Sequence, residues 1–425
     1  MATYLSKQPG SAGNRRTFTF SFWFKRAQVG DRNCIFSCEG NDNNNSFEIT
    51  IHQNNYLMIG LATFNVFETT MLFRDTSAWY HIMFVADSTQ GSSSNRTKLY
   101  INGEQITDFS ATNQSSISSN FDFGVNNTIP HKLGVQPDNG QGTNGYLADF
   151  NLIDGAALTP SSFGETDSTT GIWKSKSISG LTYGTNGVYL EFKNAGALGT
   201  DTSGNTNTYA VNNAGTNAKT TDTPSNSFLT LNPLASGSRG TFSLGNTKVQ
   251  LNLQGSEPYG QVEFGTFAVN KGKWYFEAKP TTVGAGGKLG IGISERWETN
   301  AYTNGHNNVG SAGNALYSNQ GDVKIGTGSD QTATSYTDND IIGVAFDLDN
   351  SKVYFHKNGS YQRSGDPANG TGGDTLTSSY NDYWTPWVTK DSTNSAHNPT
   401  VEFNFGNPPF TISSGNADAS GHGNF

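Results

Sequence analysis

The chain has 425 residues, of which 33% are hydrophobic and 50 are glycine, so it is long enough for two or three domains of short strands joined by many turns. Its 27 phenylalanines, 17 tyrosines and 7 tryptophans supply the apolar area that a disordered chain lacks. A formal net charge of -9, with no basic run beyond Arg15-Arg16, argues against nucleic acid as a partner. No stretch has the roughly 18 apolar residues of a membrane span, and the opening MATYLSKQPG lacks the apolar region of a signal peptide. We therefore expect a protein made in the cytoplasm that neither inserts into a membrane nor binds nucleic acid.

The first strand signals come early in the chain. At residues 17–25 the sequence TFTFSFWFK alternates strictly and places four phenylalanines on one face, which is typical of one wall of a β-sandwich core. Further strands are predicted at residues 33–36, 47–51, 57–62 and 69–73. Both cysteines, Cys34 and Cys38, lie in NCIFSCEG, where an extended strand holds their Cα atoms about 13 Å apart, too far for a disulfide. We expect two buried free thiols.

Residues 79–106 predict the central hairpin of the first half. The run WYHIMFVAD is apolar, short and rich in aromatic and β-branched residues, which favours a strand buried on both faces. After a polar turn, KLYI runs into Asn102-Gly103, the dipeptide best suited to a two-residue hairpin turn. A type I′ turn sets Leu99 opposite Ile106 and Tyr100 beside Gln105.

The segments that follow carry a family resemblance. Residues 145–154 (GYLADFNLID) predict another strand, and Thr159-Pro160-Ser161 can start a single helical turn. Together with PGSAGNRRTFTFSFWFKR, FRDTSAWYHIMFVAD, KLYINGEQ and AALTPSSFGE, this order resembles the concanavalin A-like, laminin G-like jelly-roll domain of virion proteins of tailed phages, especially marine ones. The resemblance continues through GIWKSKSISGLTYGTNGVYLEF and covers roughly residues 1–230. It implies the fold far more firmly than any ligand.

The second half of the sequence repeats the pattern of a buried strand followed by a strand that ends in an Asn-Gly turn. A buried strand at Ile341 to Phe346 is followed by a strand at 352–356, and Asn358-Gly359 closes that hairpin. These segments, with KGKWYFEAKP, KLGIGIS, YWTPWV and VEFNFG, resemble the SPRY domain over about residues 240–412, which implies a bent β-sandwich that binds partners through loops at one end. The polar insertion 296–337 is longer and richer in Asn and Gly than that resemblance leads us to expect.

The predicted fold is therefore all-β, with two tandem antiparallel β-sandwiches, a concanavalin A-like jelly roll and then a SPRY-like sandwich. The predicted boundaries are residues 1–215 for the first domain, 216–240 for an extended linker, 241–412 for the second domain and 413–425 for a mobile tail.

The sequence offers little catalytic chemistry. It lacks the GxSxG, HExxH and phosphate-binding loop motifs, and the nearest approach to a glycosidase carboxylate set, Glu165 with Asp167, lies in a turn-rich segment that we expect to be solvated. His81 falls inside the buried strand and is predicted to be a hydrogen-bonded core residue, whereas His356 is predicted to face solvent. Asp201 begins an oxygen-rich stretch that lacks the calcium-loop pattern and is predicted to form a turn. We expect no catalytic residues, no metal site and no cofactor.

Aromatic residues within polar segments give the one binding signal. Trp297, Tyr302 and Tyr317 sit among Asn, Gly and Ser in the 296–337 insertion, and rings in such surroundings can stack on the flat CH faces of a sugar while amides satisfy its hydroxyls. The alternative, favoured by the usual burial of large aromatics, is that these rings fasten a long loop. Trp384 and Trp387 follow strand alternation and are predicted to lie in the core.

The resemblance implies a non-enzymatic structural protein of a phage virion. The favoured role is a tail fibre or appendage adhesin that binds a host surface glycan or another receptor, contacts other virion proteins and self-associates, with a trimer favoured. The first alternative is a capsid decoration protein without a host ligand, and a glycan-cleaving enzyme is less favoured.

Overall fold

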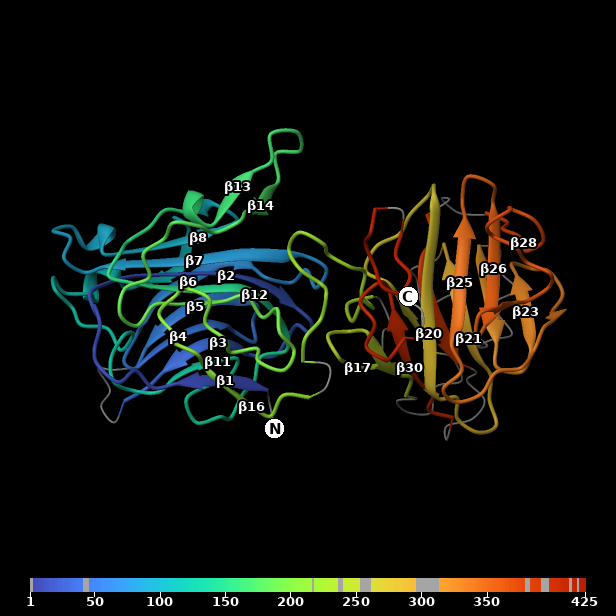
Figure 1. The fold of residues 1–425 in the computed structure, drawn as a ribbon, viewed down its shortest axis with the longest axis horizontal. Coiled ribbons are helices and arrows are strands. Elements are labelled where there is room, and N and C mark those ends of the chain that lie inside the picture. Colours follow the sequence, from blue (N-terminus) through green and yellow to red (C-terminus); the bar gives the residue numbers. More distant parts are fainter. Residues whose placement is uncertain are drawn as a thin grey trace. The chain divides into compact units, whose positions relative to one another are not determined.

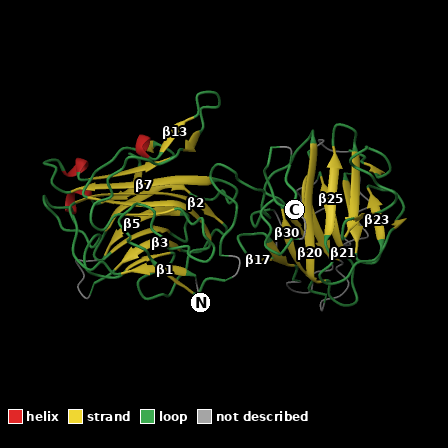
Figure 2. Cartoon of the chain, in the orientation of Figure 1, coloured by secondary structure: helices red, strands yellow, loops and turns green. Residues whose placement is uncertain are grey.

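The computed structural model describes residues 3–40, 46–215, 218–235, 240–252, 261–295, 313–378, 383–390, 397–412, 415–418 and 420–425. The chain forms two compact units, Met1–Ser227 and Phe228–Phe425, with a boundary inside the segment predicted as a linker. Strands make up nearly all the regular structure in both units (Figures 1 and 2). The predicted all-β fold is confirmed.

The first unit is a sandwich of two large antiparallel sheets. One has eight strands in the order β10-β6-β5-β4-β3-β11-β1-β16 and the other has six in the order β15-β12-β2-β7-β8-β9. The eight are β1 (Tyr4–Lys7), β3 (Asn33–Cys38), β4 (Phe47–Ile51), β5 (Tyr56–Leu61), β6 (Asn65–Leu72), β10 (Phe109–Thr112), β11 (His131–Leu133) and β16 (Ala210–Asn212). The six are β2 (Thr17–Arg26), β7 (Trp79–Asp87), β8 (Thr97–Ile101), β9 (Glu104–Gln105), β12 (Gly145–Asp154) and β15 (Val188–Leu190).

The core of the first unit lies between these two sheets and is built largely from phenylalanine. The alternating residues Phe18, Phe20, Phe22 and Phe24 of β2 are all fully buried, as predicted. Phe20 stacks on Phe47 of the opposite sheet, with ring centroids 5.7 Å apart and planes 9° apart. Contacts of this kind join the two layers and bury a large apolar area.

The predicted hairpin at residues 79–106 is confirmed. β7 and β8 pair side by side, and the turn residues Asn102 and Gly103 have φ values of 49° and 84°, as a type I′ turn requires. Tyr100 pairs with Gln105, and the Ile106 amide donates to the Leu99 carbonyl at 2.9 Å.

Three 3-10 turns, η1 (Ser93–Asn95), η2 (Gln114–Ser116) and η3 (Pro160–Ser162), complete the regular structure of the first unit with a small hairpin of β13 (Gly164–Thr166) and β14 (Trp173–Ser175). The turn η3 lies where Thr159-Pro160-Ser161 predicts one. The β13–β14 hairpin lies beside β8 of the six-stranded sheet, and its turn projects outward (Figure 1).

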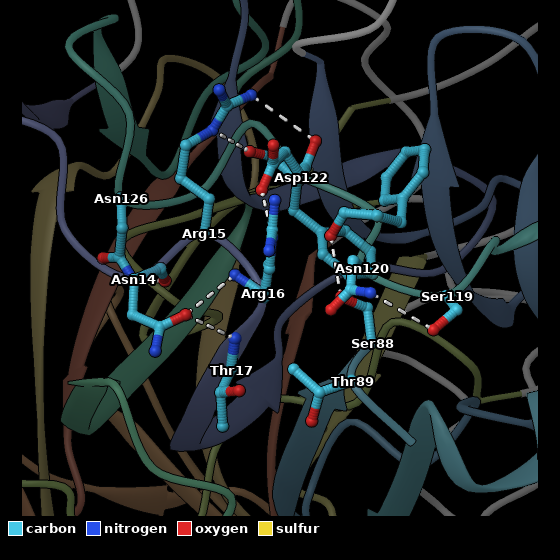
Figure 3. A network of polar contacts seen from close by, with 12 residues as sticks. Asn14, Arg15, Arg16, Thr17, Ser88, Thr89, Ser119, Asn120, Asp122 and Asn126 are labelled. Carbon is cyan, nitrogen blue, oxygen red and sulfur yellow. Dashed lines mark hydrogen bonds and ion pairs between the residues drawn. The ribbon is translucent and has the colours of Figure 1, made fainter. Parts of the chain in front are cut away.

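A polar network fixes the entry to β2 (Figure 3). The Asn14 side-chain oxygen accepts hydrogen bonds from the amides of Arg16 and Thr17 at 3.0 and 2.9 Å. The Arg16 guanidinium reaches Asp122 at 2.8 Å, and Nε of Arg15 donates to the Phe123 carbonyl at 2.8 Å. These contacts tie the loop-rich return after η2 to the first core strand.

Part of the predicted linker packs on the first unit. Nζ of Lys25 lies 2.8 Å from Oδ2 of Asp222, and neither side chain is exposed. The Trp79 indole donates to Oδ1 of Asp222 at 2.9 Å, so both carboxylate oxygens are satisfied. A buried ion pair of this kind holds residue 222 firmly against the end of β2.

The second unit is also a two-layer sandwich, with strand orders β17-β18-β30-β20-β25-β26-β27, where β28 also pairs with β26, and β19-β29-β21-β22-β23-β24. The first sheet contains β17 (Thr241–Ser243), β18 (Lys248–Gln250), β20 (Lys273–Thr282), β25 (Ile342–Asp347), β26 (Lys352–Lys357), β27 (Ser360–Tyr361), β28 (Asp374–Thr375) and β30 (Thr400–Asn404). The second contains β19 (Gln261–Phe264), β21 (Leu289–Ser294), β22 (Asn314–Ser318), β23 (Asp322–Ile325), β24 (Gln331–Thr332) and β29 (Thr385–Lys390).

The hairpin of β25 and β26 matches its prediction, since Asn358 and Gly359 adopt φ values of 50° and 81°. Trp384 and Trp387 are buried, also as predicted. The insertion 296–337 is not one polar loop, because its later part forms β22, β23 and β24 of the six-stranded sheet.

Candidate binding surface

The end of the second unit where β19 stops and β20 and β29 begin is the candidate binding surface. Residues 265–272 cross there from one sheet to the other, and an isolated bridge joins Val269 to Trp384. The Thr385 hydroxyl donates to the Phe267 carbonyl at 3.0 Å, and the Gly265 amide donates to the Pro386 carbonyl at 2.9 Å. The crossing segment is therefore held to the start of β29 by main-chain and side-chain hydrogen bonds.

Three aromatic side chains at this end are strongly exposed. Phe267 is 42% exposed, Trp274 43% and Tyr383 48%. Nε1 of the Trp274 indole donates to the Lys271 carbonyl at 2.8 Å, so its polar atom is satisfied while much of the ring remains in contact with solvent. Covering such rings with a ligand removes apolar area from water, which favours binding.

Polar groups lie beside Trp274. The Gly272 amide donates to Oδ1 of Asp349 at 2.9 Å, and the Leu348 amide donates to the Gly272 carbonyl at 3.0 Å, which fixes the β25–β26 turn against this segment. Nζ of Lys273 lies 3.6 Å from Oδ2 of Asp347. Aromatic faces flanked by carboxylate and ammonium groups suit a ligand with both apolar CH faces and hydroxyls.

The predicted ligand-binding residues Trp297 and Tyr302 lie outside the described residues, within 296–312. Both ends of that segment are placed. Ser294, the last residue of β21, pairs with Thr385, the first residue of β29, and the Glu295 amide donates to the Gly313 carbonyl at 2.8 Å. The segment with Trp297 and Tyr302 therefore leaves and re-enters the fold at the end that carries Tyr383.

Tyr317 does not present its ring at the surface, as its predicted ligand-binding role requires. It lies in β22, where residues 314–318 are all buried, and its own side chain is fully buried. Its ring packs edge-on against Tyr336 with centroids 5.2 Å apart, and its hydroxyl donates to the Thr334 carbonyl. Burial raises the pKa of the Tyr317 hydroxyl to about 12. A ring enclosed in this way has no free face for a sugar.

The sequence analysis missed Phe267, Trp274 and Tyr383. Trp274 lies in KGKWYFEAKP, which the resemblance to the SPRY domain assigns to a strand of the sandwich, and Tyr383 lies beside Trp384, which strand alternation assigns to the core. The available signal was position, because Trp274 directly follows Lys271-Gly272-Lys273 at the very start of β20, where a strand is entering the fold from solvent.

A serine and a histidine lie in hydrogen-bond contact inside the first unit, an arrangement that in hydrolases forms a nucleophile and its base. Ser21 Oγ lies 2.8 Å from Nε2 of His81, a distance suited to proton transfer. However, the Trp173 indole donates to Nδ1 of His81 at 3.1 Å. Neutral His81 therefore carries its proton on Nε2 and donates it to Ser21. In this tautomer His81 cannot accept the serine proton.

Burial explains the rest of the His81 environment. The side chain is fully buried, and loss of hydration lowers its pKa to about 3. The prediction of a hydrogen-bonded core histidine is confirmed. The pair helps to position Trp173 through the hydrogen bond to His81. The Trp173 ring lies so close to Gly103 and Gly164 that a Cβ atom at either glycine would be 2.5 Å from it.

His356, in contrast, does not face solvent as predicted. It is 5% exposed, and its Nε2 lies 2.7 Å from the Tyr275 hydroxyl. The physical reason is Gly343, which pairs with His356 from the neighbouring strand β25. Because this glycine has no side chain, the imidazole of His356 can lie over it. Burial lowers the pKa of His356 to about 4.

The remaining polar motifs form turns or ion pairs. Lys174 contacts both Glu165 and Asp167, and Asp167 accepts the amides of Thr169 and Thr170, which lower its pKa to about 2. Asp201 accepts the amides of Ser203 and Asn207 and forms the predicted turn.

Cys34 and Cys38 are free and buried, and burial raises the pKa of the Cys34 thiol to about 12, as expected of unreactive core thiols.

In the part of the chain that the structure describes, no group of three or more His, Cys, Asp or Glu side chains could hold a metal ion. Across the same residues, no helix has the length and apolar character to span a membrane.

Comparison with known proteins identifies both units. Residues 3–162 match the concanavalin A-like lectin/glucanases superfamily in its laminin G-like form, and residues 273–368 match the SPRY domain. The chain therefore carries a concanavalin A-like domain followed by a SPRY domain. No curated protein matches the chain.

Solved structures with similar folds include the SPRY domain of human HERC1, with 16% identity, coverage of 43% of this chain and 99% of that chain, and a TM-score of 0.31. The PSpry domain of TRIM65 shows 14% identity, coverage of 41% and 91%, and a TM-score of 0.29. A heptameric SAP-like pentraxin from Limulus polyphemus shows 20% identity, coverage of 37% and 72%, and a TM-score of 0.28.

Proposed function

We propose that this chain, with its concanavalin A-like domain and its SPRY domain, is a non-enzymatic adhesin that binds a surface glycan through the end of the SPRY unit that carries Phe267, Trp274 and Tyr383. The resemblance of residues 1–230 to virion proteins of tailed phages supports a place in a tail fibre or appendage. The host surface then supplies the glycan or receptor, and other virion proteins hold the chain in the particle.

The observation that carries the proposal is the exposure of three aromatic rings at one end of a rigid sandwich. Each ring remains more than two-fifths exposed, which costs free energy unless a partner covers it. The same end carries both termini of the segment that holds Trp297 and Tyr302. Aromatic rings beside carboxylates and amides match the alternating CH faces and hydroxyls of a saccharide.

Two features support a binding role without catalysis. His81 is fixed in the tautomer that donates to Ser21, so this pair cannot deprotonate the serine. Glu165 and Asp167 both contact Lys174 on the β13–β14 hairpin, and the hydrogen bonds to Asp167 lower its pKa to about 2, whereas a glycosidase needs one protonated acid.

The experiment is a glycan array and a host-cell pull-down with the whole protein and the double variant Trp274→Ala/Tyr383→Ala. We expect the variant to bind at least about tenfold more weakly, since each lost stacking contact is worth roughly 1 kcal/mol. Ile172→Ala is the matched control, because Ile172 is 65% exposed on the β13–β14 hairpin of the other unit. Equal binding by the double variant and the wild type would refute the proposed surface.

Two alternatives remain distinguishable by experiment. Copies spread over the head of a virion in electron micrographs would favour a capsid decoration protein, whereas a few copies on the tail favour the adhesin. Release of reducing ends from host polysaccharide would favour a glycan-cleaving enzyme. Sedimentation of the purified chain tests the proposed trimer.

A further inference from the structure

A row of polar residues crosses the outer face of the larger sheet in the second unit. Five residues on neighbouring strands pair in succession across this sheet: Asn404 of β30, Glu277 of β20, Gly343 of β25, His356 of β26 and Tyr361 of β27. Residues directly paired across antiparallel strands share one face of a sheet. Their neighbours along the strands, such as Phe276 and Val344, belong to the core, so this row faces away from it.

Hydrogen bonds run along the row with a defined direction. The Gly359 amide donates to Nδ1 of His356 at 3.1 Å, so the imidazole proton lies on Nε2 and is donated to the Tyr275 hydroxyl at 2.7 Å. The Tyr275 hydroxyl in turn donates to Oε1 of Glu277 at 2.9 Å. Nδ2 of Asn404 donates to Oε2 of Glu277 at 3.0 Å. Every side chain of the network is therefore oriented before any partner arrives.

Residues 420–425 cover one end of this network. Nδ2 of Asn404 also donates to the main-chain carbonyl of Asn424 at 2.8 Å. The Phe425 ring packs edge-on against Tyr275, with ring centroids 5.0 Å apart and planes 75° apart. The covering segment is folded back by paired hydrogen bonds between the main chains of Asn416 and Phe425, at 2.8 and 2.9 Å.

The cover is attached differently from the strands around it. Residues 420–425 belong to no strand of the sheet, and they reach the network through a hydrogen bond to the Asn424 carbonyl and an edge-on contact of the Phe425 ring. Such attachments open locally far more easily than a core strand does. Asn404 and Tyr275, by contrast, lie in β30 and β20 and keep their positions through the sheet.

We propose that Asn404 and Tyr275 form a peptide-binding site whose ligand is a segment with an aromatic side chain directly after a hydrogen-bonded main-chain carbonyl, and that residues 420–425 occupy this site as a releasable cover. The side-chain amide of Asn404 donates a hydrogen bond to the carbonyl, and the Tyr275 ring packs against the aromatic side chain. Tyr275 directly follows Trp274 in β20, but consecutive residues of a strand face opposite sides of the sheet. Variants at Asn404 and Phe425 therefore test this site without changing the residues of the proposed glycan-binding end.

The covering segment competes with any added peptide. A tethered ligand acts at an effective concentration on the order of millimolar, so the wild-type site should reject the same peptide added at micromolar concentration. Removing the aromatic ring of the tethered copy should open the site without altering its walls.

The test measures binding of a fluorescent hexapeptide, SGHGNF, to the whole protein by anisotropy. We expect Phe425→Ala to bind it at least about tenfold more tightly than the wild type does. The peptide SGHGNA should not bind, and adding Asn404→Ala to Phe425→Ala should abolish binding, with melting curves confirming that each variant is folded. Equal binding to wild type and Phe425→Ala, no binding to either, or binding that survives Asn404→Ala would overturn the proposal.

Discussion

Ser294 and Thr385 face each other at the last rung between β21 and β29. This pairing fixes where residues 296–312 leave the second sandwich, and it sets Tyr383, two residues before Thr385, at the same end. Phe267, Trp274 and Tyr383 thus meet the solvent at the end of the β-sandwich where the segment 296–312 begins and ends. Loops carried at the end of a rigid sandwich are a common place for recognition sites.

Tyr317 should behave as a core residue. Replacing it with alanine removes a fully buried ring from between two sheets, and we expect the free energy of unfolding of the second unit to fall by about 3–5 kcal/mol. Tyr317→Phe, which loses only the hydrogen bond to Thr334, should cost about 1 kcal/mol. Urea denaturation measures both, and an unchanged midpoint for Tyr317→Ala would show that the ring is not packed.

The buried pair of Lys25 and Asp222 should show strong coupling. Lys25→Met leaves the Asp222 carboxylate buried without its cation, and we expect a loss of about 3–5 kcal/mol in the first unit. The double variant Lys25→Met/Asp222→Leu removes both charges and should recover much of that loss. A double-mutant cycle measures the coupling, and additive effects of the two single changes would show that the pair does not interact.

The first unit should lose stability on mild acidification. His81 and His131 are buried, and burial lowers their pKa to about 3 and about 4, well below the value near 6.5 of an unfolded histidine. The unfolded chain therefore binds more protons in this range, so the stabilisation is complete above pH 6.5 and is lost as the pH falls toward 4. We expect a loss of about 2 kcal/mol for each histidine between pH 7 and pH 5.

Urea midpoints at pH 7, 6 and 5 measure this loss. His81→Asn should flatten the dependence, since it removes one of the two buried titrating groups. Stability that stays constant from pH 7 to pH 5 in the wild type would mean that these histidines keep their ordinary pKa in the folded protein.

Local sequence patterns predicted the architecture correctly where neighbouring residues alone determine which face a side chain takes or where a turn forms. The alternation at residues 17–25 and the Asn-Gly dipeptides at 102–103 and 358–359 each specify a face or a turn from neighbouring residues alone. Pairing across long distances was beyond such rules. Burial of His356 depends on the missing side chain of Gly343, and burial of Tyr317 depends on strands β21 and β23 on either side of it.

The candidate surface was only partly visible for the same reason. Trp297 and Tyr302 stand out because polar residues surround them, whereas Trp274 and Tyr383 sit within apolar runs and look like core. Their exposure follows from their position at the first residues of β20 and just before β29, where the strands emerge from the sandwich. Sequence alternation does not show at which rung a sheet stops covering its side chains.

The most direct test of the binding function is the affinity of the purified protein for host cells or a host glycan, compared with that of Trp274→Ala/Tyr383→Ala. The account predicts an affinity at least about tenfold lower for the double variant at an unchanged melting temperature, with Ile172→Ala binding as the wild type does. Undiminished binding by the double variant, or a loss that only tracks a lower melting temperature, would contradict it.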